Sequence, residues 1–125
     1  MEFKPPYIVK AGRYKHYNYF ITYNDMWYCA YVEIPIHHPF YNVSYDDIPI
    51  DVHGGVTFAG NHRMCHDHYC IGWDYHHVGD YNPFFTTFFN EPVHHWTVNE
   101  IETECIDVIN QLVKFDNKLI KIFYE

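Results

Sequence analysis

The chain has 125 residues, of which 48% are hydrophobic and 19% are charged. This length and composition predict a single folded domain over residues 1–125 and exclude a mainly disordered protein. Sixteen acidic residues against eight basic ones leave a formal charge of -8, which argues against binding to polymeric nucleic acid because such a charge repels phosphate backbones.

The sequence also argues against a membrane partner. No run reaches the roughly 18 apolar residues of a membrane-spanning helix. Residues 1–6 contain an acid and two prolines where a signal peptide needs apolar residues. We therefore expect a soluble, intracellular protein in which the four cysteines remain free thiols.

The first half of the chain predicts short strands separated by turns. Tyr17 to Tyr23 and Met26 to Ile34 are rich in aromatic and β-branched residues, and Asn24-Asp25 between them favours a turn. We therefore expect a β-hairpin here. Prolines then break residues 36–50 into an irregular connection, in which the polar residues 44–47 indicate a loop or a short helical turn.

Two further short strands are predicted in the middle of the chain, from Val52 to Phe58 and from Tyr69 to Trp73. Residues 60–68 between them are polar and lack any period, which indicates an exposed loop joining neighbouring strands. Residues 81–95 contain two prolines around a phenylalanine-rich stretch. That stretch fits a buried strand or a hydrophobic lid, and the pattern does not separate the two.

The last part of the chain predicts one long helix. Thr97 and Glu100 form a capping box, and apolar residues recur at spacings of three and four from Val98 to Val113. The run Leu119 to Tyr124 alternates with a charged residue and favours a closing strand. The predicted fold is therefore α+β: an antiparallel sheet with one long C-terminal amphipathic helix packed on it.

Most of the residues with reactive side chains lie in two segments, Asp51 to Phe58 and Gly72 to Asp80. Their glycines allow the backbone to turn sharply or to approach a ligand closely. Their histidines and aspartates supply acid, base, metal-ligating and hydrogen-bonding groups. Packing alone does not account for this combination.

Four residues in these segments, His53, Asp74, His77 and Asp80, support more than one function. Two imidazoles and two carboxylates suit a divalent metal such as zinc, manganese or iron and leave a position for water. The same side chains could act without a metal as general acids and bases, or could bind the polar groups of a ligand. Their spacing matches no standard zinc signature, and the flanking glycines favour strand and turn over helix.

A nucleotide is one ligand that such a pocket could hold. Carboxylates accept hydrogen bonds from ribose hydroxyls, the N–H groups of Gly54, Gly55 and Gly79 could face a phosphate, and Trp73 could stack on a base. The opposing interpretation is that these glycines form ordinary turns. The residues His62, Cys65, His66, His68 and Cys70 invite a zinc interpretation too, but their spacing lacks a second paired half, so a solvated histidine-rich loop is favoured.

The chain resembles a small uncharacterised protein family of bacteriophages and prophages. The resemblance spans about Cys29 to Leu112 and depends mainly on the two blocks from Asp51 to Phe58 and from Gly72 to Asp80. It adds residues outside these blocks, notably His38 and Tyr41, to the expected site. The expected ligand-binding set is then His38, Tyr41, His53, Gly54, Gly55, Thr57, Trp73, Asp74, His77, Gly79 and Asp80.

Small phage proteins of this type often act against host defence, so the resemblance implies an accessory protein of the host cytoplasm. We expect it to sequester a nucleotide immune signal, such as a cyclic or ADP-ribose-type nucleotide. The first alternative is a hydrolase acting on such a nucleotide, with or without a divalent metal. The second is a homo-oligomeric module for protein–protein interaction. The fold class alone does not choose among these functions.

Overall fold

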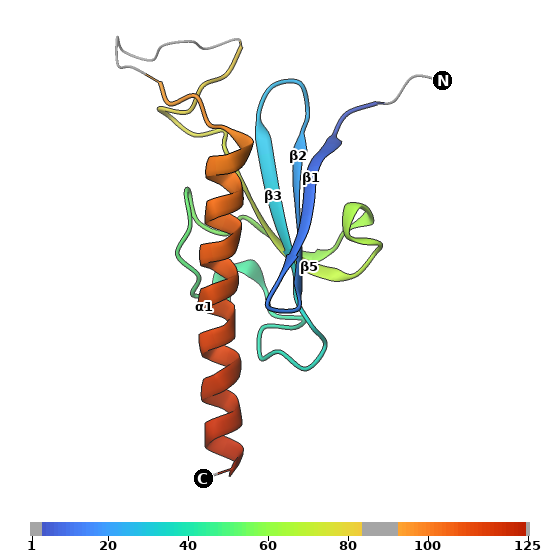
Figure 1. The fold of residues 1–125 in the computed structure, drawn as a ribbon, viewed down its shortest axis with the longest axis vertical. Helices are drawn as coiled ribbons and strands as arrows, with labels where there is room; N and C mark the ends of the chain where they lie inside the picture. Colours follow the sequence, from blue (N-terminus) through green and yellow to red (C-terminus); the bar gives the residue numbers. More distant parts are fainter. Residues whose placement is uncertain (1–3, 84–92, 125) are drawn as a thin grey trace.

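The computed structural model describes residues 4–83 and 93–124, with side chains up to residue 116. An antiparallel sheet of five strands, in the order β1-β2-β3-β5-β4, is covered on one face by a single helix (Figure 1). The predicted α+β architecture is confirmed. The elements are β1 (Tyr7–Tyr14), β2 (Tyr17–Tyr23), β3 (Tyr28–Glu33), β4 (Phe58–Asn61), β5 (Tyr69–Asp74) and α1 (Val98–Tyr124).

The predicted hairpin is formed by β2 and β3, and its turn lies at Asn24 and Asp25. The side-chain Oδ1 of Asn24 accepts hydrogen bonds from the backbone N–H groups of Met26 and Trp27, at 3.0 and 2.9 Å. Asp25 has a φ of 74°, in the left-handed region that aspartate tolerates better than most residues. The turn chemistry that predicted this hairpin therefore forms it.

The sheet also contains a strand that the sequence pattern missed. β1 pairs with β2 across a two-residue turn in which both Lys15 and His16 have a positive φ, 49° and 71°. Most β1 side chains are exposed or half-buried because the strand lies at the sheet edge. Its sequence accordingly shows no clean alternation, and Lys-His is not a usual pair for such a turn.

The strand predicted from Val52 to Phe58 is wrong. Residues 52–57 form a turn-containing loop, and β4 begins only at Phe58. The reason is local, since Gly54 and Gly55 have φ values of 70° and 79°, which an extended strand excludes. Two residues of the predicted 60–68 loop belong to β4, and a short 3-10 helix, Arg63–Cys65, fills part of the remainder.

Helix α1 begins where predicted and ends later than predicted. Thr97 Oγ1 accepts from the Glu100 N–H at 3.2 Å, and Glu100 Oε1 accepts from the Thr97 N–H at 3.0 Å, so the capping box is formed. The helix then continues to Tyr124, and the closing strand predicted from Leu119 to Tyr124 is wrong. No glycine or proline interrupts this stretch, and a short apolar run fits either structure.

The core lies between α1 and strands β1 to β3, with β5 completing it. Ile21, Val32 and Ile71 of the sheet are fully buried, as are four helix residues spaced by three or four positions, Ile101, Cys105, Val108 and Leu112. This apolar stripe explains why the helix lies along the sheet (Figure 1). The loops at the end of the sheet near the helix N-terminus are left to form the site.

Two further sequence predictions concern connecting segments. The polar residues 44–47 include a short 3-10 helix, Tyr45–Asp47, as the pattern indicated. The phenylalanine-rich stretch within residues 81–95 lies largely outside the described residues, so the choice between strand and lid stays open. Among the residues that the structure describes, none belongs to a helix long and apolar enough to cross a membrane.

Candidate functional site

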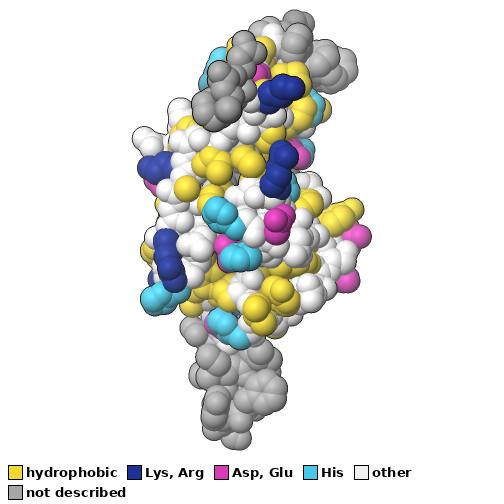
Figure 2. Space-filling model, turned by 90° about the vertical axis from the view of Figure 1, so that its right-hand side faces the viewer, with side chains coloured by type: hydrophobic (Ala, Val, Ile, Leu, Met, Phe, Trp, Pro, Cys, Tyr) yellow, Lys and Arg dark blue, Asp and Glu magenta, His cyan; other side chains and the backbone are white. Residues whose placement is uncertain are grey.

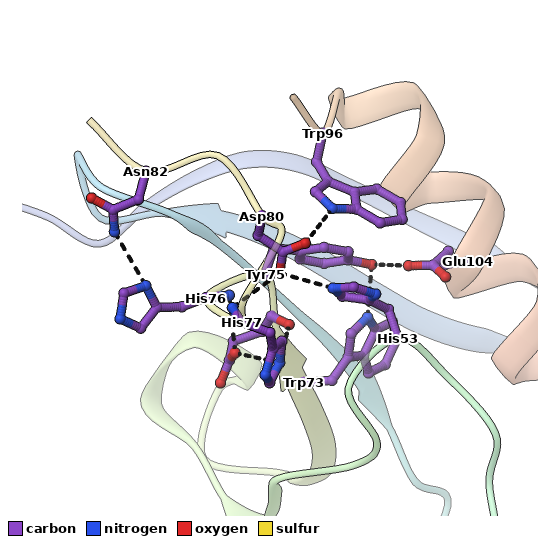
Figure 3. Close-up of polar contacts among 10 residues, drawn as sticks. His53, Trp73, Tyr75, His76, His77, Asp80, Asn82, Trp96 and Glu104 are labelled. Atoms are coloured by element: carbon purple, nitrogen blue, oxygen red, sulfur yellow. Dashed lines mark hydrogen bonds and ion pairs between the residues drawn. The ribbon is translucent and has the colours of Figure 1, made fainter. Parts of the chain in front are cut away.

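Three segments that are distant in the sequence bring reactive side chains together (Figure 3). His53 comes from the loop before β4, and His77 and Asp80 come from the turn that follows β5. Trp96 comes from the residues directly before α1. The Asp80 N–H donates to the His77 carbonyl at 2.9 Å, which closes the turn. The strand-and-turn geometry expected for this segment is therefore present.

Asp80 is the buried centre of this site. Only 4% of its side chain is exposed, and its two oxygens accept three hydrogen bonds. Oδ1 accepts from the indole of Trp96 at 2.8 Å, and Oδ2 accepts from the His77 backbone N–H at 3.1 Å. Oδ2 also lies 2.8 Å from Nε2 of His53. Such contacts stabilise a buried carboxylate and hold it in one orientation.

Asp74 and His77 form a second carboxylate–imidazole pair. Nε2 of His77 lies 3.0 Å from Oδ1 of Asp74 and 3.1 Å from its backbone oxygen. A Cβ atom on Gly54 would lie 2.2 Å from the same Nε2, and Gly54 has a φ of 70°. Glycine is therefore required at position 54, because any side chain there would displace the His77 ring.

The two pairs are adjacent, so that His53, His77 and Asp80 form one group. Each offers a ligand atom within 4.8 Å of the others, and the described residues contain no other group of this kind. Two imidazoles and one carboxylate are a ligand set for zinc or for non-haem iron, with positions left open. The site can therefore hold a divalent metal, or it can act through two imidazoles that carboxylates orient.

Aromatic side chains enclose the His53 imidazole. Its ring stacks on Tyr75 at a centroid distance of 5.1 Å and packs against Trp96 at 4.8 Å and edge-on to His77 at 5.4 Å. About a quarter of the His53 side chain, 26%, remains exposed. The imidazole is thus held in a fixed orientation and still reaches solvent.

A buried hydrogen-bond chain links this enclosure to the helix. The Trp73 indole donates to the Tyr75 hydroxyl at 2.9 Å, and that hydroxyl donates to Glu104 of α1. Burial, together with the Glu104 contact, raises the pKa of Tyr75 above its ordinary value. Tyr75 therefore stays protonated and serves as a rigid platform for His53 rather than as an acid.

A pocket of about 230 Å³ opens beside the buried carboxylate. Ligand pockets for drug-sized molecules measure roughly 300–1,000 Å³, so this one suits a small polar group or one end of a larger ligand. The pocket and the metal-capable group share His77 and Asp80. The described residues that line it are His76, His77, Val78, Gly79, Asp80, Asn82 and Val93.

Several residues of the predicted ligand-binding set are not part of the group formed by His53, His77 and Asp80. His38 is 3% exposed, and its ring nitrogens bond the Leu112 carbonyl at 2.9 Å and the Phe40 N–H at 3.0 Å. Trp73 is buried, and its indole N–H bonds to Tyr75. Tyr41 packs on Tyr69 and lines a different pocket. These side chains therefore make contacts that stabilise the fold, and they lie outside the group formed by His53, His77 and Asp80.

The glycines and the threonine of the expected ligand-binding set differ in whether they shape the site. Gly54 packs against His77, and Gly79 lies in the turn that carries Asp80, so both shape the site. Gly55 faces open space, and its N–H bonds to the Val52 carbonyl. The Thr57 N–H bonds to the Gly72 carbonyl at 2.9 Å and extends the pairing of β4 with β5.

The polar side chains of the histidine-rich loop bond within the loop or to Glu33 at the end of β3. Nδ1 of His62 accepts from the Met64 N–H at 3.0 Å, and Nδ1 of His68 lies 2.7 Å from Oε1 of Glu33. Cys65 is buried, which departs from the expectation of an exposed loop, and Cys70 is buried within β5, which the sequence predicted as a strand. Their thiols contact one another and raise the pKa of Cys70 above its ordinary value.

Trp96 is the member of the site that sequence reasoning missed. Its indole N–H donates the hydrogen bond that fixes Oδ1 of Asp80, and its ring packs against the His53 imidazole. The sequence does carry one signal, since Trp96 directly precedes the Thr97 capping residue. An apolar residue in that position commonly folds back against the first turn of the helix.

Comparisons of the chain with protein-family models, with curated proteins and with solved structures find no match.

Proposed function

We propose that the protein binds a small phosphate-bearing ligand through a divalent metal ion held by His53, His77 and Asp80. The observation that carries this proposal is that their ligand atoms lie within 4.8 Å of one another. The residues come from two loops, and His53 and His77 are 24 positions apart in the sequence. Local packing does not require two imidazoles and a buried carboxylate to meet. Metal coordination does.

The charge of the site makes the metal necessary for such a ligand. The described residues that form the group and line its pocket include Asp80 but no lysine or arginine, and Asp74 contacts His77 from beside them. A bare site of this composition repels phosphate. A bound divalent cation is the largest local charge in such a site and reverses its sign. Phosphate binding here therefore has to depend on the metal.

The face of the molecule shown in Figure 2 offers no basic patch that could replace the metal. On the face shown in Figure 2, lysine and arginine side chains lie singly and form no continuous basic patch. This distribution agrees with the net charge of -8. A small ligand with one or two phosphates, gripped locally, fits this surface better than a polymeric backbone does.

Neighbouring side chains hold the proposed metal ligands in place. Asp74 holds Nε2 of His77, and Trp96 holds Oδ1 of Asp80. Partners of this kind fix the orientation of metal ligands, and their removal weakens metal affinity by about 10- to 100-fold. The proposed ligands are therefore held in position before a metal ion binds.

Nucleotide immune signals are the first ligands to test, because the resemblance to a small uncharacterised bacteriophage protein family implies an accessory role against host defence. The pocket of about 230 Å³ beside Asp80 would take the phosphate end of such a molecule. A binding protein holds the ligand intact and releases it unchanged when the protein is denatured.

The decisive experiment measures metal and nucleotide together. The purified protein is loaded with zinc or manganese, incubated with cyclic and ADP-ribose-type nucleotides, washed and heat-denatured, and the supernatant is analysed. We expect stoichiometric metal and retained nucleotide, and loss of both in His53→Ala or after chelation. His68→Ala, in which the changed imidazole lies in the histidine-rich loop, is the matched control and should retain both. Retention that survives chelation would contradict the proposal.

Hydrolysis of the ligand is the second candidate function, and the Asp74–His77 pair favours it. A carboxylate that orients an imidazole beside a metal position is a common general-base arrangement. In this reaction the metal would be held by His53 and Asp80 only, and the free ring nitrogen of His77 would take the proton of an attacking water. The water oxygen would bond to phosphorus, the bond from phosphorus to the leaving oxygen would break, and His77 would return the proton to that oxygen. Analysis of the same supernatant for cleaved nucleotide, with Asp74→Asn as the variant, separates hydrolysis from binding.

A further inference from the structure

A second pocket, of about 200 Å³, lies next to the candidate site and has a different character. It shares two rings, Tyr75 and Trp96, with the enclosure of His53. Almost all of its lining is aromatic. The described residues that line it are Tyr23, Met26, Trp27, Tyr28, Tyr75, Tyr81, His95 and Trp96.

Imidazoles stack on the rings of this aromatic pocket and hold them in place. Trp27 lies against His76 with a centroid distance of 3.9 Å and an interplanar angle of 18°. Tyr81 lies against His95 at 4.0 Å and 22°. Tyr23 and Tyr28 pack on each other at 4.8 Å. Because each ring is braced by a neighbour, the pocket does not depend on a ligand to form.

Two of the rings are made richer in electrons by hydrogen bonds to carboxylates. The Trp96 indole N–H donates to Asp80, and the Tyr75 hydroxyl donates to Glu104 (Figure 3). Donation to an anion moves electron density toward the ring and strengthens the negative potential over its faces. Such faces attract cations.

The aromatic pocket has no lysine or arginine in its described lining, and carboxylates contact two of its rings. Burial raises the pKa of Tyr23, and the neighbouring Tyr28 and the carboxylate of Asp25, in the turn between β2 and β3, raise it further. The whole chain carries a charge of -8. The pocket is therefore complementary to a positive charge and not to a phosphate.

We propose that this aromatic pocket binds a quaternary or methylated ammonium group of a small molecule. Several aromatic rings around one small space, with no lysine or arginine in the described lining, are the features that recognise such groups in proteins. The volume of about 200 Å³ is below that of pockets for drug-sized ligands and suits one compact head group. This binding needs no metal, so it is independent of the phosphate site proposed above.

The test compares two molecules of the same shape that differ in charge. Choline carries a trimethylammonium group, and 3,3-dimethyl-1-butanol carries a neutral tert-butyl group in its place. We expect calorimetric titration to show choline binding about tenfold more tightly than its neutral isostere, which is the size of a cation–π contribution. Chelation with EDTA should leave the choline affinity unchanged, which separates this proposal from the metal-dependent one.

Variants locate the binding within the pocket. Trp27→Leu should abolish choline binding, whereas Trp27→Phe should retain a weaker affinity because a ring face remains. Tyr45→Leu, which changes an exposed tyrosine outside the pocket, is the control for the general effect of the substitution and should bind choline normally. Circular dichroism of each variant confirms that it is folded.

Three results would overturn the proposal. The first is equal affinity for choline and its neutral isostere, which would show a merely apolar pocket. The second is tighter binding of adenosine than of choline, which would show that the pocket takes a flat ring. The third is the absence of choline binding at millimolar concentration to the folded protein.

Discussion

Two histidine-bearing regions of the molecule resemble each other in sequence and differ in space. Around Asp80, imidazoles from two separate loops meet a buried carboxylate, and the ligand atoms lie within 4.8 Å. In the loop of residues 62–68, His62 caps a short helical turn and His68 pairs with Glu33 at the surface. The number of histidines in a stretch of sequence therefore does not predict whether their side chains meet at one site. Long-range contacts decide it.

The cause of the difference lies in the partners that each region meets. The turn after β5 folds against the 51–57 loop and Trp96, both contributed by other parts of the chain. The 62–68 loop joins two neighbouring strands and closes on itself, since the His62 and His68 backbones bond to each other at 3.3 Å. The hydrogen bonds of this loop stay within the hairpin or reach Glu33 of β3, and among the described residues its side chains form no group of converging ligand atoms.

The largest expected effect is on metal affinity. His53→Ala removes a proposed ligand, so zinc affinity measured by calorimetry should fall by more than about 100-fold, which exceeds the loss caused by removing a side chain that only orients a ligand. His68→Ala should leave the affinity unchanged. Equal losses in the two variants would erase the distinction between the two regions.

Removal of the buried Asp80 carboxylate should lower the free energy of unfolding much more than removal of the exposed His68 imidazole. Asp80→Ala leaves the Trp96 indole N–H and the His77 amide without their acceptor. We expect the free energy of unfolding from denaturant titration to fall by about 3 kcal/mol. The exposed pair of His68 with Glu33 contributes little, so His68→Ala should change it by less than about 1 kcal/mol. A small effect at Asp80 would show that its contacts are not stabilising.

The two adjacent glycines provide a sharper test of the site geometry. Gly54→Ala and Gly55→Ala both place a side chain at positive φ, at a cost of about 1–2 kcal/mol each. Only Gly54→Ala also drives a Cβ into the His77 ring. We expect zinc affinity to drop in Gly54→Ala and to persist in Gly55→Ala. The reverse order would place His77 outside the metal site.

The smallest effect concerns the pH dependence of stability. Burial lowers the pKa of His38 below the ordinary 6.5, despite the opposing Leu112 contact. The unfolded chain therefore binds more protons between the two pKa values, and stability falls as the pH decreases through 6.5. The slope is at most about 1.4 kcal/mol per pH unit. Denaturant titrations across this range should show a shallower decline in His38→Gln.

Some of the fold was predictable because its signals are local. The Asn24-Asp25 turn and the capping box at Thr97 depend on residues that are close in sequence, and both are confirmed. The edge strand Tyr7–Tyr14 was missed because half-exposed strands lack alternation. The end of α1 was misplaced because the run after Val113 carries no stop signal.

The candidate site was only partly predictable for the opposite reason. Glycine beside histidine and aspartate marked the two segments that supply His53, His77 and Asp80. The third partner, Trp96, and the aromatic pocket depend on which loops the sheet order brings together. No local pattern contains that information.

By itself, the sequence determined the strand-rich first half, the helix start and the chemical character of two short segments, because propensity and capping act between near neighbours. The tertiary structure alone decided which histidines meet a carboxylate, that His38 and Trp73 are buried, and that aromatic rings close a second pocket. Those outcomes depend on the order β1-β2-β3-β5-β4 and on the helix that covers it, since only long-range packing sets the distances between loops.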